Sequence, residues 1–268
     1  MNKIVTWMLA TMMVLGLTAK VYAAEPLTCW FPPDWKSKPE QAAAIAGVLA
    51  KGSGSEVRPR IAKSYPEILA AFATNQPNLV YVGSFVQAMI KARDLGTPLV
   101  QNVDGKELYS GVLVYPKDQD PEAILKNSPA LIAYAVGASS GESSAKAATD
   151  GKAAMGVANH GAACAAVEAG KAKAAVVKNW WWQGNKDKFP NLAVYEIPGI
   201  SVAGNPDNIL TASKVVPAEV REKLAAAAIA GKEAFGAPAM QPFDPAKLEF
   251  PLELMKKGGI DPLTYTWQ

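Results

Sequence analysis

A serine-rich loop is the part of the sequence best suited to chemistry. Residues 136–141 follow an apolar run that predicts a buried strand, and Ser139 and Ser140 stand where a helix is expected to begin. Free N–H groups at a helix start, the positive end of the helix dipole and the serine hydroxyls can together hold an anion. An ordinary N-cap turn uses the same residue types, so the loop alone leaves both interpretations open.

The same loop, Gly137-Ala138-Ser139-Ser140-Gly141, also fits the G-x-S-x-G turn of a serine hydrolase. Such an enzyme needs a general base, and His160 is the only histidine of the chain. In that hydrolase fold the histidine lies near the chain end, whereas His160 comes soon after the serines. We therefore expect no enzyme, and keep an extracytoplasmic serine hydrolase as the alternative.

Aromatic and sulfur-containing residues are the other candidates for ligand contacts. Trp30 stands at the end of an expected strand, and Trp180 begins a run of three tryptophans that cannot all face a core. Cys29 and Cys164 can be free, paired or ligand-binding, and the sequence does not choose between these states. One histidine and two distant cysteines form no metal-ligand pattern, so we expect no metal and no cofactor.

The N-terminal residues predict a secretory signal peptide at 1–23. Lys3 precedes an uncharged apolar run, Lys20 ends that run too early for a membrane span, and Val21-Tyr22-Ala23 suits cleavage. Without Lys3 and Lys20 the formal charge falls from +3 to +1, and the remaining basic residues are scattered. Neither a nucleic acid nor a membrane surface is therefore an expected partner.

Short apolar runs alternate with amphipathic helical stretches through the rest of the chain, which predicts an α/β fold. No linker divides the two series, so we expect two lobes joined by two crossing segments near 108–115 and 200–208. The predicted division places residues 24–110 and 206–268 in lobe 1 and residues 111–205 in lobe 2. A hinge of this kind lets the lobes close on a ligand.

Six segments, in this order, resemble the phosphonate/phosphite/phosphate-binding subfamily of type 2 periplasmic solute-binding proteins, which serve ABC transporters. They are Ser64-Tyr65-Pro66-Glu67, Tyr81-Val82-Gly83-Ser84, Tyr109-Ser110-Gly111-Val112-Leu113-Val114, Ala138-Ser139-Ser140-Gly141, Asn159-His160-Gly161 and Ala203-Gly204-Asn205-Pro206. The resemblance implies a two-lobed fold with the ligand in the interlobe cleft. It assigns ligand contacts to Tyr65, Ser84, Tyr109, Ser139, Ser140, His160 and Asn205.

The resemblance further implies a small oxyanion or phosphonate-like ligand, held by neutral donors and helix ends and delivered to the permease of an ABC importer. Asn205 replaces a family aspartate, and no carboxylate follows His160 at the family spacing, so we do not expect preference for an aminophosphonate. Some relatives sense arsenite through a thiol, which keeps Cys29 and Cys164 as possible contacts and a sensor kinase as the alternative partner. We expect a monomer.

Overall fold

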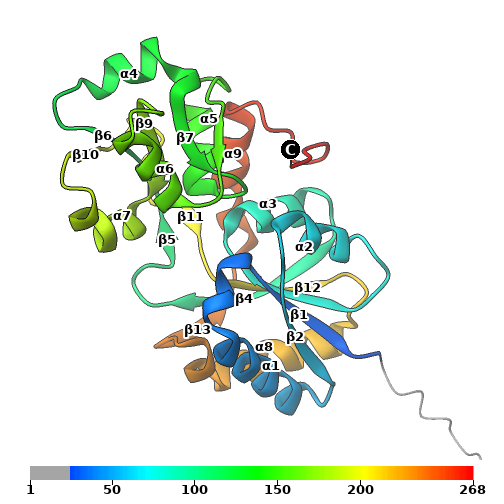
Figure 1. Cartoon of the computed structure of the whole chain (residues 1–268). Coiled ribbons are helices and arrows are strands. Elements are labelled where there is room, and N and C mark those ends of the chain that lie inside the picture. Colours follow the sequence, from blue (N-terminus) through cyan, green and yellow to red (C-terminus); the bar gives the residue numbers. More distant parts are fainter. Residues whose placement is uncertain (1–24, 268) are drawn as a thin grey trace, which may run out of the picture.

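The computed structural model describes residues 25–267, so the predicted signal peptide at 1–23 lies outside the described residues. Within that part of the chain, no helix is both long and apolar enough to cross a membrane. Two α/β lobes make up the molecule, as the sequence predicts, and each is built around its own sheet (Figure 1).

The sheet of lobe 1 has six strands in the order β13-β4-β12-β3-β1-β2. Strands β1, β2 and β3 are parallel, whereas β12 runs antiparallel to both β3 and β4. The strands are β1 (Leu27–Phe31), β2 (Val57–Ile61), β3 (Asn78–Val82), β4 (Gly96–Val103), β12 (Ile209–Ser213) and β13 (Ala239–Pro242).

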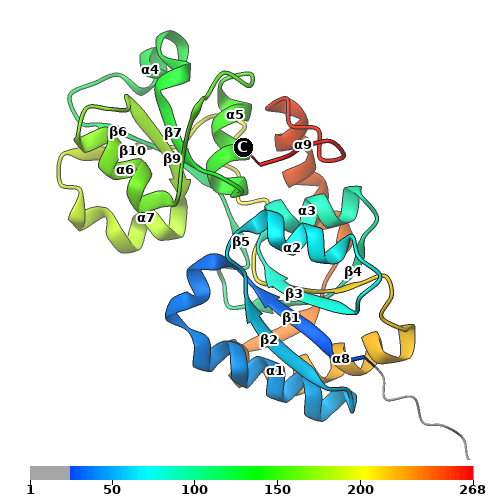
Figure 2. The same ribbon diagram turned by 45° about the vertical axis from the view of Figure 1, so that its right-hand side comes forward.

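Helices cover both faces of this sheet. Helices α1 (Pro39–Ser53) and α8 (Ala218–Ala230) pack on one face, and α2 (Tyr65–Phe72) and α3 (Ser84–Ala92) on the other (Figure 2). The spacing of Ala42, Ile45, Ala46 and Leu49 places these four side chains on the buried stripe of α1. Gly54 then ends the helix in the left-handed conformation that glycine adopts without strain.

The sheet of lobe 2 has five strands in the order β10-β6-β9-β7-β8, of which β7, β8 and β9 are parallel. Its strands are β6 (Gly111–Pro116), β7 (Ile132–Ala135), β8 (Met155–Val157), β9 (Ala174–Lys178) and β10 (Leu192–Tyr195). Helices α4 (Pro121–Asn127) and α5 (Ser144–Ala148) supply residues to one core cluster. Helices α6 (His160–Glu168) and α7 (Asn179–Asn185) supply residues to the other.

Two short strands, β5 (Leu108–Tyr109) and β11 (Asn205–Pro206), pair antiparallel where the chain crosses between the lobes. Helix α9 (Glu249–Lys257) also contacts both lobes, because Met255 joins the core of lobe 1 and Leu254 that of lobe 2. The described part of the chain thus has the predicted hinge of two crossing segments. The exact boundaries after residues 110 and 205 stay a prediction.

Short helical turns complete the described chain. They are Pro33–Ser37, Pro129–Leu131, Ser139–Ser143, Lys186–Lys188, Lys232–Phe235 and Pro245–Leu248. The tryptophan run forms α7, a helix for which the sequence analysis gave no prediction. Strand β13, within a proline-rich stretch, pairs with β4 at the edge of the lobe 1 sheet.

Candidate functional site

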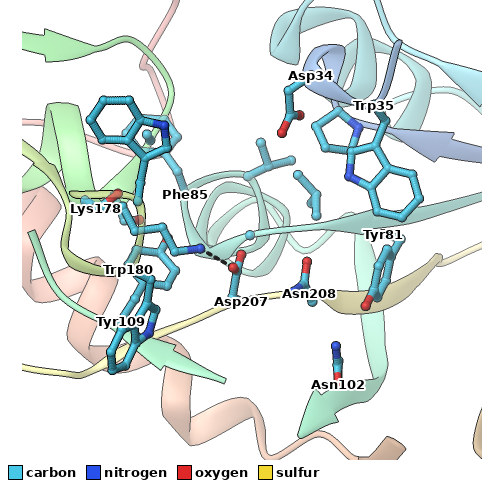
Figure 3. Close-up of a pocket in the computed structure, with 18 of the residues that line it drawn as sticks. Asp34, Trp35, Tyr81, Phe85, Asn102, Tyr109, Lys178, Trp180, Asp207 and Asn208 are labelled. Atoms are coloured by element: carbon cyan, nitrogen blue, oxygen red, sulfur yellow. Dashed lines mark hydrogen bonds and ion pairs between the residues drawn. The ribbon is translucent and has the colours of Figure 1, made fainter. Parts of the chain in front are cut away.

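A cavity of about 590 Å³ lies between the lobes and is lined by residues of both (Figure 3). The segments that follow β1 and β3 of lobe 1 reach it from one side, and those that follow β7, β8 and β9 of lobe 2 from the other. Ligands of α/β proteins bind beyond the carboxyl ends of parallel strands. The cavity is therefore where this fold places a binding site.

The serine loop, residues 137–140, lines the cavity from lobe 2. Gly137 has a φ of +76°, and a Cβ there would lie 2.9 Å from the ring of Tyr65 in lobe 1, so the position requires glycine. Ser139 and Ser140 begin a single helical turn, as predicted. The Ser139 hydroxyl is buried and has no hydrogen-bond partner among the described residues.

A buried carboxylate, that of Glu142, holds the first residue of the serine loop in place. Its Oε2 accepts the backbone N–H of Gly137 at 2.9 Å. Its Oε1 accepts from Lys146 Nζ at 2.8 Å and from the hydroxyl of Tyr265 at 2.7 Å. Three donors around one carboxylate offset the cost of burying its charge.

His160 lines the same cavity at the first turn of α6. Asn159 caps this helix, because its side chain accepts the N–H of Ala162 at 2.9 Å. Burial, with a smaller contribution from the positive charge of Lys178, lowers the pKa of His160 to about 4. The imidazole is therefore neutral at pH 7, and its Nδ1 is buried without a partner among the described residues.

This lowered pKa predicts a pH dependence of stability. As the pH falls below about 6.5, the unfolded chain protonates its histidine while folded His160 stays neutral, so the His160 contribution to stability is lost progressively toward pH 4. Between pH 7 and pH 4.5 the wild type should lose about 2 kcal/mol more unfolding free energy than His160→Asn. Urea unfolding of both proteins at the two pH values measures this, and equal losses would contradict it.

An ion pair inside the cavity was not predicted. Lys178, the last residue of β9, pairs with the carboxylate of Asp207, as Figure 3 shows. Its Nζ also lies 4.2 Å from the ring centroid of Tyr109. The expectation of a site with neutral donors alone is therefore wrong. A lysine at the end of a buried lobe 2 strand was the available signal for a positive charge at the cavity, although not for its pairing with Asp207.

Asp34, on the turn after β1, brings a second carboxylate to the cavity (Figure 3). Although part of its surface stays accessible, desolvation raises its pKa, and the nearby charge of Asp207 raises it further. Its backbone hydrogen bond, Lys38 and Lys178 act in the opposite direction. Two carboxylates, those of Asp34 and Asp207, therefore line the cavity from positions other than the two that the family comparison considered.

Of the seven predicted ligand contacts, five line the cavity: Tyr65, Tyr109, Ser139, Ser140 and His160. Ser84 does not, because it is fully buried behind Tyr109, with its hydroxyl 2.7 Å from that of Tyr109. Asn205 does not either, because it lies inside the crossing ladder, where its amide donates to the Tyr109 carbonyl at 3.3 Å. Asp207, two residues later, faces the cavity instead.

The possible contacts from the cysteines and Trp30 are also corrected. Cys29 packs in the core beneath α1, and Cys164 packs between α6 and its sheet, so they lie in different lobes and are free thiols. Burial raises the pKa of both, that of Cys164 to about 12. Trp30 points to the opposite face from Cys29, where its indole N–H donates to Asn78 at 2.8 Å.

Aromatic side chains line two further parts of the cavity. Trp180, predicted as a possible contact, lines it and is 38% exposed, whereas Trp182 is buried. Trp35, Tyr81 and Phe235 form an edge-to-face row on the lobe 1 side that sequence reasoning missed. No group of histidine, cysteine and acidic residues suited to a metal ion occurs within residues 25–267.

One protein-family model covers most of the chain. Residues 36–247 match the family model described as ABC transporter, phosphonate, periplasmic substrate-binding protein. No curated protein sequence matches the chain.

Solved structures with the same fold include PhnD1 from Prochlorococcus marinus in complex with methylphosphonate, at 15% identity and a TM-score of 0.66, covering 87% of this chain and 98% of that one. A binding-protein component of an ABC phosphonate transporter from Pseudomonas aeruginosa matches at 15% identity and a TM-score of 0.62, covering 87% of this chain and 88% of that one. A Xanthomonas citri protein bound to ATP matches at 12% identity and a TM-score of 0.69, covering 88% and 98%.

Proposed function

This chain belongs to the family of periplasmic substrate-binding proteins of phosphonate ABC transporters, and we propose that its interlobe cavity binds one small organophosphonate. The observation that carries this proposal is a set of buried polar atoms without partners. The Ser139 hydroxyl and Nδ1 of His160 are buried and unpaired among the described residues, and both residues line a cavity that also contains Lys178. A buried polar atom without a partner is costly, and a ligand oxygen would remove that cost.

In the proposed complex, the phosphonate oxygens accept from Ser139, Ser140 and the neutral His160. Lys178 provides the positive charge, and the serine hydroxyls select by geometry. The organic group then lies toward lobe 1, between Tyr65 and the aromatic row of Trp35, Tyr81 and Phe235. Methylphosphonate, which the Prochlorococcus protein holds, is the simplest probe for this arrangement.

We propose that the protein binds its ligand without converting it. No hydrogen bond joins Ser139 or Ser140 to His160, and no carboxylate orients the imidazole, in the part of the chain that the structure describes. A serine nucleophile needs both relationships. Steady turnover of a generic ester that disappears in Ser139→Ala would favour the hydrolase alternative.

The family places the protein with an ABC transporter in the periplasm, and we propose that it acts there as a monomer that delivers ligand to the permease. Export by cleavage after residue 23 is part of the same proposal. A sensor kinase is the alternative partner. The arsenite alternative has no support from the cysteines, since neither lines the cavity and their raised pKa values disfavour thiolates.

A thermal-shift series on the purified mature protein tests the function. Methylphosphonate and ethylphosphonate should raise the melting temperature, because a ligand at 100 times its Kd adds about 2.7 kcal/mol of stability. Sulfate and arsenite serve as controls and should give smaller shifts. If no phosphonate raises the melting temperature while another oxyanion does, the proposed ligand class is wrong.

A further inference from the structure

The C-terminal segment, residues 261–267, lies beside the serine loop although more than 120 positions separate them in sequence. Figures 1 and 2 show this segment in red next to α9, between α5 of lobe 2 and α3 of lobe 1. One of its contacts with lobe 2 is the hydrogen bond from the Tyr265 hydroxyl to Oε1 of Glu142, at 2.7 Å. Glu142 in turn holds the N–H of Gly137, the first residue of the serine loop.

The same segment is fixed to lobe 1 by the end of α3. The guanidinium of Arg93 donates to the carbonyls of Pro262 and Tyr265, each at 2.7 Å. The ring of Tyr265 packs edge-to-face on Phe85 of α3, with centroids 5.5 Å apart. Trp267 lies 5.9 Å from the same Phe85 ring and also approaches Gly137. Tyr265 thus joins α3 of one lobe to the loop carboxylate of the other.

Within lobe 2, Glu142 has one other side-chain donor, Lys146, which is 2.8 Å away on α5. Both burial and the hydrogen bond with Glu142 raise the pKa of Tyr265, so its hydroxyl stays protonated and keeps donating at neutral pH. Removing it leaves a carboxylate that is 2% exposed with one hydrogen-bond donor fewer. The acceptor that holds Gly137 would then be less firmly placed.

We propose that Tyr265 is a positioning residue for ligand binding: its hydrogen bond to Glu142 fixes the serine loop in its binding conformation and ties that loop to α3 of lobe 1. This inference rests on the proposed function, because it takes the serine loop to be a ligand contact. Tyr265 itself does not line the cavity. It acts through Glu142 and Gly137.

The test is Tyr265→Phe, which keeps the ring on Phe85 and removes only the hydroxyl. Tyr195→Phe is the matched control, because the Tyr195 hydroxyl donates to Glu122 at 2.8 Å on the exposed surface of lobe 2, away from the cavity. Calorimetry with methylphosphonate, well below the melting temperature, should show a Kd about tenfold higher for Tyr265→Phe. The Kd of Tyr195→Phe should equal that of the wild type.

Hydrogen exchange of the ligand-free proteins gives a second readout that does not depend on the ligand. The peptide that contains residues 137–143 should exchange about tenfold faster in Tyr265→Phe than in the wild type, with the core strand β7 unchanged. Unchanged exchange in that peptide overturns the proposal, as does a Kd that stays at the wild-type value while only the melting temperature falls. If the wild type binds no phosphonate, the proposed function fails, and the exchange result alone decides the positioning role.

Discussion

Replacing Ser139 and Ser140 together with alanine should weaken methylphosphonate binding by about 2–4 kcal/mol, because each lost hydrogen bond to a charged group costs roughly 1.5–3 kcal/mol. That is a rise in Kd of about thirtyfold to a thousandfold. Both side chains line the cavity, and the Ser139 hydroxyl lacks a partner among the described residues. Calorimetry on the folded double variant measures the change.

Ser143→Ala is the matched control for this experiment. Ser143 is buried in the same helical turn, its hydroxyl also lacks a partner among the described residues, and it does not line the cavity. Its replacement should leave the Kd unchanged. If the double serine variant binds methylphosphonate as tightly as the wild type, the serine loop is not part of the binding site.

Lys178→Met should have an effect of similar size for a different reason. The substitution removes a positive charge from the cavity and leaves the carboxylate of Asp207 without its partner, so the anion meets an uncompensated negative charge. We expect the Kd for methylphosphonate to rise about a hundredfold or more. Adding Asp207→Asn should recover part of this loss, since it removes the repelling charge.

The same variants test ligand specificity. In the wild type, Lys178 forms an ion pair with Asp207, so the amine of aminoethylphosphonate finds no free carboxylate there. We expect aminoethylphosphonate to bind no more tightly than ethylphosphonate. In Lys178→Met, Asp207 becomes available and the Kd ratio should move toward the amine. Calorimetric Kd ratios at pH 7 and moderate salt check this. A clear preference of the wild type for the amine would show that Asp34 or Asp207 already serves it.

Local sequence patterns were enough to predict most elements of the fold. The apolar run at 27–31 predicts a strand and forms β1 with the same bounds. Helical patterns at 38–51, 161–170 and 251–257 lie within a few residues of α1, α6 and α9. Helix α7 was missed because tryptophan and asparagine are weak helix formers. The packing of Trp182 in the lobe 2 core, with Trp181 against the same cluster, stabilises the helix there. The pattern at 217–231 predicts a helix with Pro217 in its first turn, and the structure has this helix as α8 with Pro217 as its N-cap.

The sequence predicted site residues only where a single short segment contains the complete pattern. The serine loop and His160 each stand at a helix start, which the sequence shows directly. The pairing of Lys178 with Asp207 joins segments 29 positions apart from the two sides of the hinge, so no local pattern indicates it. Ser84 and Asn205 were assigned because their segments occur in the same order as the family motifs. Whether each side chain faces the cavity or the hinge depends on tertiary packing, which this order does not give.

The strand order of lobe 1 affects the order in which the two lobes fold. Strand β12 lies inside the sheet, paired with β3 on one side and β4 on the other, yet it is formed by residues 209–213, after all of lobe 2. Strands β1, β2 and β3 are close to one another in the sequence, whereas β4 pairs only with β12 and β13, which lie much later in the chain. The strands of lobe 2 all fall between residues 111 and 195, so its sheet needs no pairing across such a long separation. We therefore expect lobe 2 to gain protection from hydrogen exchange during refolding before β4 does, since long-range pairing is the slower step.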